Sequence, residues 1–211
     1  NVDGSKLWVL DTNKNIYIQN ASGTSLGQWK AGDLSTSPEG IAVWGDDVWI
    51  VDSASDKIYF YDSGATWTSG THNATKTFTL TSATNAKGIA TDGSHLWLVN
   101  DSTTDKVFVF DVGGTSSNPT LSAAGSWTLA TADAKPTGLT IDPTGSSQSI
   151  WVVDAGTDKV YEYANARGLT SGSGGTPTTF SLAYGNSNPQ DIADPLSLVG
   201  QASAAGTELF A

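Results

Sequence analysis

One short pattern occurs four times along the chain, and this repetition constrains the fold more than any other feature. Each copy is an apolar run with tryptophan in second place and a polar side chain at its end. The four runs are LWVLD (7–11), VWIVD (48–52), LWLVN (96–100) and IWVVD (150–154). Their tryptophans lie 41, 48 and 54 residues apart, a period typical of propeller blades.

Three further elements accompany each tryptophan run. A second run of β-branched and aromatic residues follows it, as in NIYIQN (15–20) and KIYFYD (57–62), and such residues favour strands. A segment such as PEGIAVWG (38–45) precedes the last three tryptophan runs, and an aromatic strand closes each period. These aromatic strands are centred on Trp29, Phe78, Trp127 and Phe180. Four strands per period, here lettered A to D with tryptophan on B, predict a propeller blade.

The strand count predicts an all-β fold, a β-propeller of four-stranded antiparallel blades. The chain opens on B, C and D of the first blade, continues through three whole blades, and ends on a lone A around Ile192. We expect four blades over residues 1–195, closed by pairing that A strand with the B strand around Trp8, since closure removes an exposed sheet edge. The alternative is part of a six- to eight-bladed ring, or half a ring completed by a second chain. Residues 196–211 match no blade and are expected to form a linker-like tail.

A second period of 102 residues relates the first half of the repeat array to the second. Trp49 and Trp151, and likewise Phe78 and Phe180, are separated by this interval. The second and fourth blades also share a long connection between strands C and D, TSGTHNATKTF and TSGSGGTPTTF. These regularities indicate duplication of a pair of blades.

Charge and composition exclude several classes of partner. The net charge is −11, with 10 basic and 21 acidic residues, whereas nucleic acids and anionic membranes require clustered Lys and Arg. There is no Cys, and hence no disulfide or thiolate metal site. No apolar run is long enough to cross a bilayer. Because Met is absent even at position 1, we expect the chain to derive from a larger precursor or to follow a cleaved signal peptide.

The repeat resembles a known group of propellers. Segments such as GIATDG (88–93) and VWIVDSASDKIYFYD (48–62) look like NHL and streptogramin-lyase-type repeats. They are also similar to a repeat module of very large secreted bacterial surface proteins. This resemblance implies a non-enzymatic, extracellular structural or adhesive module. Such a module would assemble with itself or bind a glycan or peptide on one face, and its partners would be other modules or subunits of the same surface assembly, or a glycan.

The resemblance also implies an alternative function, a lyase or hydrolase with a metal ion at the channel mouth. Streptogramin lyases rely on a catalytic His, and the two histidines of this chain, His72 and His95, lie in no matching motif. We therefore expect no catalytic residue and no enzymatic activity.

A ring of acids at the ends of the B strands is the candidate metal site. Asp11, Asp52 and Asp154 occupy this position, and Asp101 stands beside it in the third blade. Such carboxylates would form a collar around the propeller axis, and calcium is the cofactor that oxygen ligands of this kind hold. The competing interpretation is that each Asp accepts hydrogen bonds from its own turn, which repetition in every blade favours.

Two tryptophans depart from the repeat and are the candidate ligand-binding residues. Trp44 stands where other blades have Asp92 and Asp142, and Trp67 lies in the long connection of the second blade. An aromatic side chain outside the repeat can stack on a sugar ring or fill a pocket of a partner. The competing interpretation is a local lid over the edge of a blade.

Overall fold

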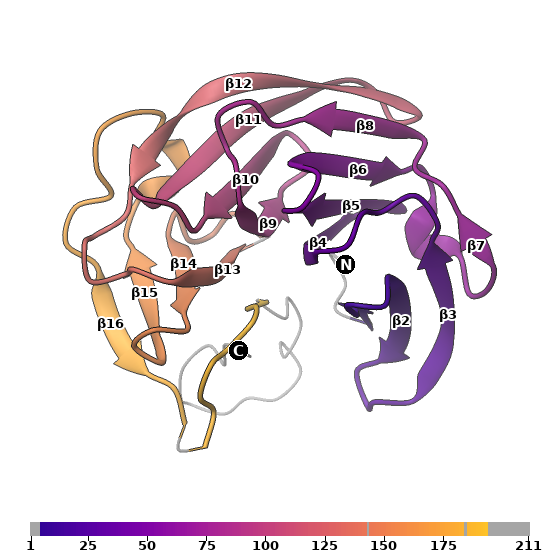
Figure 1. Ribbon diagram of the computed structural model, residues 1–211, viewed down its shortest axis with the longest axis horizontal. Coiled ribbons are helices and arrows are strands. Elements are labelled where there is room, and N and C mark those ends of the chain that lie inside the picture. Colours follow the sequence, from indigo (N-terminus) through magenta and orange to yellow (C-terminus); the bar gives the residue numbers. More distant parts are fainter. Residues whose placement is uncertain (1–4, 143, 184, 194–211) are drawn as a thin grey trace.

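The computed structural model describes residues 5–142, 144–183 and 185–193, which form four four-stranded sheets. The sheets follow one another around an arc, from the indigo strands through magenta to orange (Figure 1). This arrangement confirms the all-β prediction and is consistent with a propeller. The predicted linker-like tail, residues 196–211, lies outside the described residues. No helix in the described part of the chain is long and apolar enough to cross a membrane.

The predicted strands B, C and D are present in all four sheets and strand A in the last three; we call the sheets blades 1 to 4 in chain order. Blade 1 contains β1 (Lys6–Leu10), β2 (Asn15–Asn20) and β3 (Ser25–Ala31), and its fourth strand is β7 (Thr71–His72). Blade 2 contains β4 (Pro38–Trp44), β5 (Asp47–Asp52), β6 (Lys57–Tyr61) and β8 (Lys76–Thr79). Blade 3 contains β9 (Ala86–Thr91), β10 (His95–Asn100), β11 (Lys106–Thr115) and β12 (Asn118–Thr128). Blade 4 contains β13 (Pro136–Ile141), β14 (Ile150–Asp154), β15 (Lys159–Tyr163) and β16 (Thr178–Ser181).

Blades are held together by apolar clusters between their faces. Strand residues alternate in direction, so each tryptophan run turns Trp toward the following blade and its neighbours toward the preceding blade. Trp8 and Trp29 of blade 1 therefore pack with Val48 and Ile50 of blade 2. Equivalent clusters join blade 2 to blade 3 and blade 3 to blade 4. We call the side that carries the B-strand Trp the trailing face and the opposite side the leading face.

A feature absent from the prediction links the blades in pairs. The long connection of blade 2 runs along the outer edge of blade 1, where β7 pairs parallel with β3. The long connection of blade 4 lies in the same way beside β12, where Thr128 bridges to Ser173. Gln28 and Lys30 donate backbone hydrogen bonds to Thr68 and Gly70. Ser126 and Thr128 donate the matching bonds to Thr170 and Gly172. These two acceptors lie 102 residues after Thr68 and Gly70. We call these two connections straps.

Glycine makes the straps possible. Gly27 has φ +148° and Gly125 has φ +153°, which an L side chain rarely adopts. A Cβ atom on Gly27 would lie 2.5 Å from the carbonyl oxygen of Thr68, and one on Gly125 would lie 2.0 Å from that of Thr170. These positions bring the strap backbone against the strand.

The predicted closing pair is not among the strand pairings of the described residues. β1 forms the edge of its sheet and pairs with β2 alone. Ile192, the centre of the expected last strand, lies outside the sixteen strands and packs against Val153 and Val160 of blade 4. Blades 1 and 4 stand at opposite ends of the arc (Figure 1).

Candidate functional site

Most of the predicted acidic collar is occupied by turn hydrogen bonds. The Asp52 carboxylate accepts from the backbone N–H and the hydroxyl of Ser55, at 2.9 and 3.0 Å. Asp154 accepts from the N–H and hydroxyl of Thr157 at 2.6 and 2.7 Å. Asp11 accepts from the Asn13 N–H at 3.2 Å, and this contact lowers the pKa of its carboxyl. These contacts are those of Asx turns.

The described residues contain no group of three or more His, Cys, Asp or Glu side chains arranged to hold a metal ion. Asp101 stands apart from the turn pattern, because the side chain of Asn85 donates to its backbone carbonyl instead. The buried Asn100 takes over the turn, accepting from the Lys106 N–H at 2.9 Å. Three of the four predicted calcium ligands, Asp11, Asp52 and Asp154, thus accept hydrogen bonds within their own turns, and calcium binding itself stays a prediction.

Sequence reasoning missed one acidic residue at the junction of blades 3 and 4. Asp133 is buried, and the Tyr163 hydroxyl donates to its Oδ2 at 2.9 Å, while its Oδ1 has no hydrogen-bond partner among the described residues. Burial raises the pKa of Asp133 to about 8; the Tyr163 bond opposes this effect, and the charges of Asp154 and Asp105 add to it. Tyr61 and Asp33 form the matching pair between blades 1 and 2, at 2.9 Å. The 102-residue spacing of Tyr61 and Tyr163 was the available signal.

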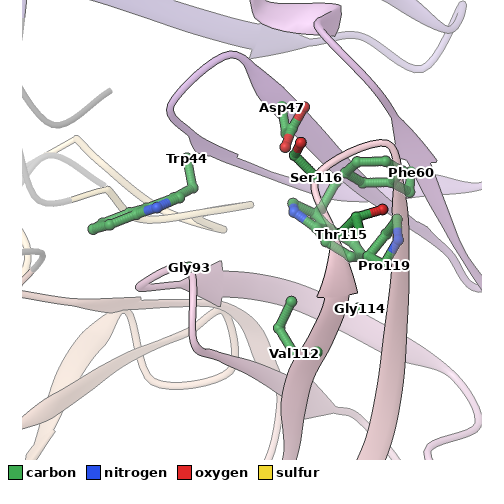
Figure 2. Close-up of a pocket in the computed structure, with 11 residues that line it drawn as sticks. Trp44, Asp47, Phe60, Gly93, Val112, Gly114, Thr115, Ser116 and Pro119 are labelled. Atoms are coloured by element: carbon green, nitrogen blue, oxygen red, sulfur yellow. The ribbon is translucent and has the colours of Figure 1, made fainter.

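The two tryptophans outside the repeat have different environments. The Trp67 ring stacks on His72, with ring centroids 3.9 Å apart, and meets Trp29 edge-on at 5.1 Å. It therefore covers the core between blades 1 and 2 as part of the strap. Trp44 instead lines an open groove between blades 2 and 3 (Figure 2).

The groove measures about 240 Å³. Trp44 forms one wall, at the end of β4, and a turn of blade 3 passes so close to it that a Cβ on Gly93 would lie 2.2 Å from the indole nitrogen. The buried rings of Trp49 and Phe60 also line it. The opposite wall is the tip of the β11–β12 hairpin. Figure 2 shows Trp44 on one side and Thr115 and Ser116 on the other, with the Trp44 ring directed away from them.

The groove exists because the junction of blades 2 and 3 lacks a group that fills the next junction. Between blades 3 and 4, the Arg167 guanidinium lies over Trp97 at 5.2 Å and pairs with Asp92 at 2.8 Å. Trp44 replaces Asp92 in blade 2. The long β11–β12 hairpin replaces the segment that carries Arg167. With both partners substituted, the groove forms beside Trp49, whose ring is itself buried.

Polar groups border the aromatic part of the groove. Asp47 lines it and accepts a hydrogen bond from the Ser63 N–H at 3.1 Å. Burial raises the pKa of its carboxyl, as do the nearby charges of Asp62 and Asp46. The hydroxyl residues Thr115 and Ser116 are exposed on the hairpin. An aromatic wall with hydroxyl and carboxylate groups around it can bind a ring that has both apolar and hydroxyl surfaces.

The two histidines of the chain lie away from this groove's lining. His72 has Nε2 2.9 Å from the Ser69 carbonyl, beneath Trp67. His95 lies near Asp92 and Asp111, at 3.5 and 3.8 Å.

Comparison with known proteins identifies the fold. No protein-family model and no curated protein matches the sequence. Among solved structures, a chain of a nidogen/laminin complex is similar at 22% identity and a TM-score of 0.52, over 90% of this chain and 69% of the other. Virginiamycin B lyase from Staphylococcus aureus is similar at 17% identity and a TM-score of 0.51, over 90% of this chain and 56% of the other.

A third solved structure, described as a 6-phosphogluconolactonase from Bacteroides fragilis, shares 17% identity at a TM-score of 0.56, over 90% of this chain and 55% of its own. The chain therefore spans little more than half the length of the two enzyme structures. At these identities the likeness concerns fold alone, and the neighbours include both enzymes and a protein from a binding complex. The predicted resemblance is confirmed at the level of fold: the chain is similar to propeller structures that include streptogramin B lyases.

Proposed function

We propose that the chain is a non-enzymatic recognition module of a secreted or cell-surface protein, and that it binds a saccharide in the Trp44 groove. The observation that carries this proposal is the coincidence of departures from the repeat. Trp44 and the long β11–β12 hairpin occur in one copy only, and both line the same groove. Residues that repeat in every blade serve packing, whereas these two leave a junction unfilled.

The lining favours a neutral sugar over other small ligands. Indole faces stack on the apolar face of a pyranose, and the side chains of Asp47, Thr115 and Ser116 can bond to ring hydroxyls. The acidic side chains of Asp46, Asp47 and Asp62 repel anionic ligands. The volume of about 240 Å³ lies below the roughly 300–1,000 Å³ of drug-sized pockets, and so suits one terminal sugar residue. The lyase alternative gains no support from the surroundings of His72 or His95.

The test is calorimetric titration of the intact chain with a panel of neutral mono- and oligosaccharides. We expect binding at millimolar to micromolar affinity, and Trp44→Ala to weaken it at least tenfold because the stacking surface is lost. Trp44→Phe keeps an aromatic face and should bind with intermediate affinity. Thr66→Ala, on an exposed turn outside the groove, is the control that should bind as the parent does.

Absence of binding to every neutral sugar, or equal binding by Trp44→Ala, would reject the saccharide groove. Release of an altered sugar or of a cleaved product during the titration would reject the non-enzymatic assignment. Nuclear magnetic resonance of the ligand distinguishes these outcomes.

A further inference from the structure

The large exposed apolar side chains of the described residues lie in the two end blades. Leu7 and Val9 of β1 are 48% and 42% exposed, and Leu26 of β3 is 41% exposed. Phe180 of β16 in blade 4 is 39% exposed. Blades 2 and 3, as far as the structure describes them, contribute no residue to this set. Exposed apolar side chains that gather on particular surfaces mark sites of association.

The repeat shows what normally covers the β1 positions. Leu7 and Val9 are the first and third residues of their tryptophan run, on the leading face of blade 1. The six side chains at these two positions in the other blades have no exposure: Val48, Ile50, Leu96, Leu98, Ile150 and Val152. Each packs in a cluster with the trailing face of the preceding blade. Blade 1 thus presents a face shaped for a preceding blade.

Blade 4 presents the opposite face. Phe180 corresponds to Trp29 and Trp127, which are 1% and 0% exposed because a following blade covers them. Trp151 is half-buried, whereas the three corresponding tryptophans of blades 1 to 3 are buried. Within the part of the chain that the structure describes, no following blade therefore covers blade 4.

The inner strands of the two ends are also complementary. β1 is a sheet edge with no strand A beside it among the described residues. Beyond blade 4, a Cβ on Gly138 would lie 2.6 Å from the Cα of Asp191. In the preceding junction, a Cβ on Gly88 would lie 2.7 Å from the Cα of Gly138. The segment around Asp191 thus occupies the place of strand A of a following blade.

We infer that blade 4 of one copy binds blade 1 of a second copy, head to tail. This contact repeats the three junctions within the chain: Trp151 and Phe180 cover Leu7 and Val9 of the second copy, and the segment around Ile192 lies beside its β1. The occupant is a second copy because its leading face is of the same type as those that cover blades 1 to 3. Within the described residues no apolar cluster joins blade 4 to blade 1 of the same chain.

The contact joins two different surfaces, so it is heterologous. It produces a ring if successive rotations close and a filament if they do not. It is independent of the saccharide groove, which lies between blades 2 and 3, and either proposal can fail without the other.

The first test is sedimentation equilibrium of the intact chain over a range of concentrations. We expect a mass above the 21.8 kDa of the monomer that increases with protein concentration. It should also increase with NaCl, because copies with net charge −11 repel one another at low ionic strength and salt screens this repulsion. A monomer at every concentration and salt level would overturn the inference. A chain that closes on itself would give this result.

Complementary variants provide the second test. Val9→Glu damages only the leading face and Phe180→Glu only the trailing face, and both positions are exposed in the monomer. Each variant alone should remain monomeric. An equimolar mixture should form a one-to-one dimer, since the intact blade 4 of the first meets the intact blade 1 of the second.

Thr179→Glu is the matched control, because this exposed neighbour of Phe180 points to the other side of β16. It should assemble like the parent chain. Thermal unfolding verifies that all three variants fold. A mixture that stays monomeric, or single variants that still self-associate, would show that the end faces do not join in this manner.

Discussion

At the scale of single residues, the repeat assigns its acidic side chains to structural roles and leaves one of them in an unfavourable state. Asp52 and Asp154 stabilise their own turns through bonds to Ser55 and Thr157. Asp133 differs from them because its Oδ2 accepts from the Tyr163 hydroxyl rather than from its own turn, and because burial and the charge of Asp154 raise its pKa to about 8. A buried carboxyl of this kind favours its protonated form.

Asp133→Asn should stabilise the protein at alkaline pH. The pKa of Asp133 is about 8 in the folded chain and 3.8 in the reference state, so the unfolded state releases the proton first and stability falls as pH rises from about 4 to 8. Asn stays neutral and retains an acceptor for Tyr163. We expect a gain of about 1–3 kcal/mol at pH 8, as one pKa unit corresponds to about 1.4 kcal/mol.

Urea unfolding at pH 4 and at pH 8 measures this difference. The gain should be much smaller at pH 4, close to the reference pKa of 3.8, where the parent carboxyl is protonated in the folded state and partly protonated in the unfolded state. A variant that is equally or less stable than the parent at pH 8 would contradict the argument. Asp33→Asn, at the matching Tyr61 pair whose carboxylate also accepts from the Ala74 N–H, is the comparison variant and should not show the alkaline gain.

At the scale of elements, sequence patterns predicted the strands and missed the straps. Strands A to D of blades 2 to 4, and B to D of blade 1, follow from short runs of β-branched and aromatic residues, which report local burial and alternation. β7 comprises Thr71–His72 and pairs in parallel with a strand about 40 residues earlier. A strand of two residues is too short to show an alternation of apolar and polar side chains. Its pairing depends on the position of blade 1. The duplicated connection in blades 2 and 4 was the one visible sign.

Sequence patterns likewise identified one wall of the candidate groove and missed the other. Trp44 was identified because it interrupts a repeat, which is a local observation. The opposite wall, formed by the β11–β12 hairpin, was not identified, because strands of 10 and 11 residues contain Gly, Ser and Thr where an apolar pattern would have been recognised. Trp67 also interrupts the repeat. Its contacts with Trp29 and His72 depend on tertiary packing, so the sequence did not show that its ring is covered.

Gly125→Ala should detach the strap of blade 4 from β12. The added methyl group would overlap the Thr170 carbonyl at 2.0 Å, and φ at this position is +153°. We expect a loss of about 2–4 kcal/mol in unfolding free energy, the range of backbone strain combined with lost hydrogen bonds. Amide hydrogen exchange should accelerate at Ser126 and Thr128, which donate to the strap.

Gly175→Ala is the control for Gly125→Ala. Gly175 has φ +77° and no atom within 4 Å of an added Cβ, so it bears left-handed strain of about 1–2 kcal/mol without a clash. Its Ser126 and Thr128 amides should remain protected. Unchanged exchange at these amides in Gly125→Ala would show that the strap does not depend on this close approach.

At the scale of the whole molecule, the balance of charge sets the response to salt. The net charge is −11, and self-repulsion of this size destabilises a compact chain. The ion pairs between blades among the described residues include Lys87–Glu39 and Arg167–Asp92, both at 2.8 Å. Salt weakens such pairs only modestly, since partly exposed pairs contribute about 0–1 kcal/mol.

Raising NaCl from 20 to 500 mM should therefore increase the melting temperature, because screening of the general repulsion outweighs the loss from the two pairs. Differential scanning calorimetry at a low, fixed protein concentration separates this effect from self-association. Lys87→Gln should have a lower melting temperature than the parent at low salt. This difference between variant and parent should be smaller at high salt. A melting temperature that falls with NaCl would mean that the specific ion pairs outweigh the net charge.

The straps also determine how the chain can be divided. Blade 1 receives part of its outer edge from residues that follow β6, and blade 3 receives the equivalent from residues that follow β15. A cut between β3 and β4, or between β12 and β13, separates a blade from its own edge. A cut between β8 and β9 leaves both strapped pairs whole. A recombination event or an engineered domain insertion is therefore best tolerated there, so that two blades are the smallest portable unit of this protein.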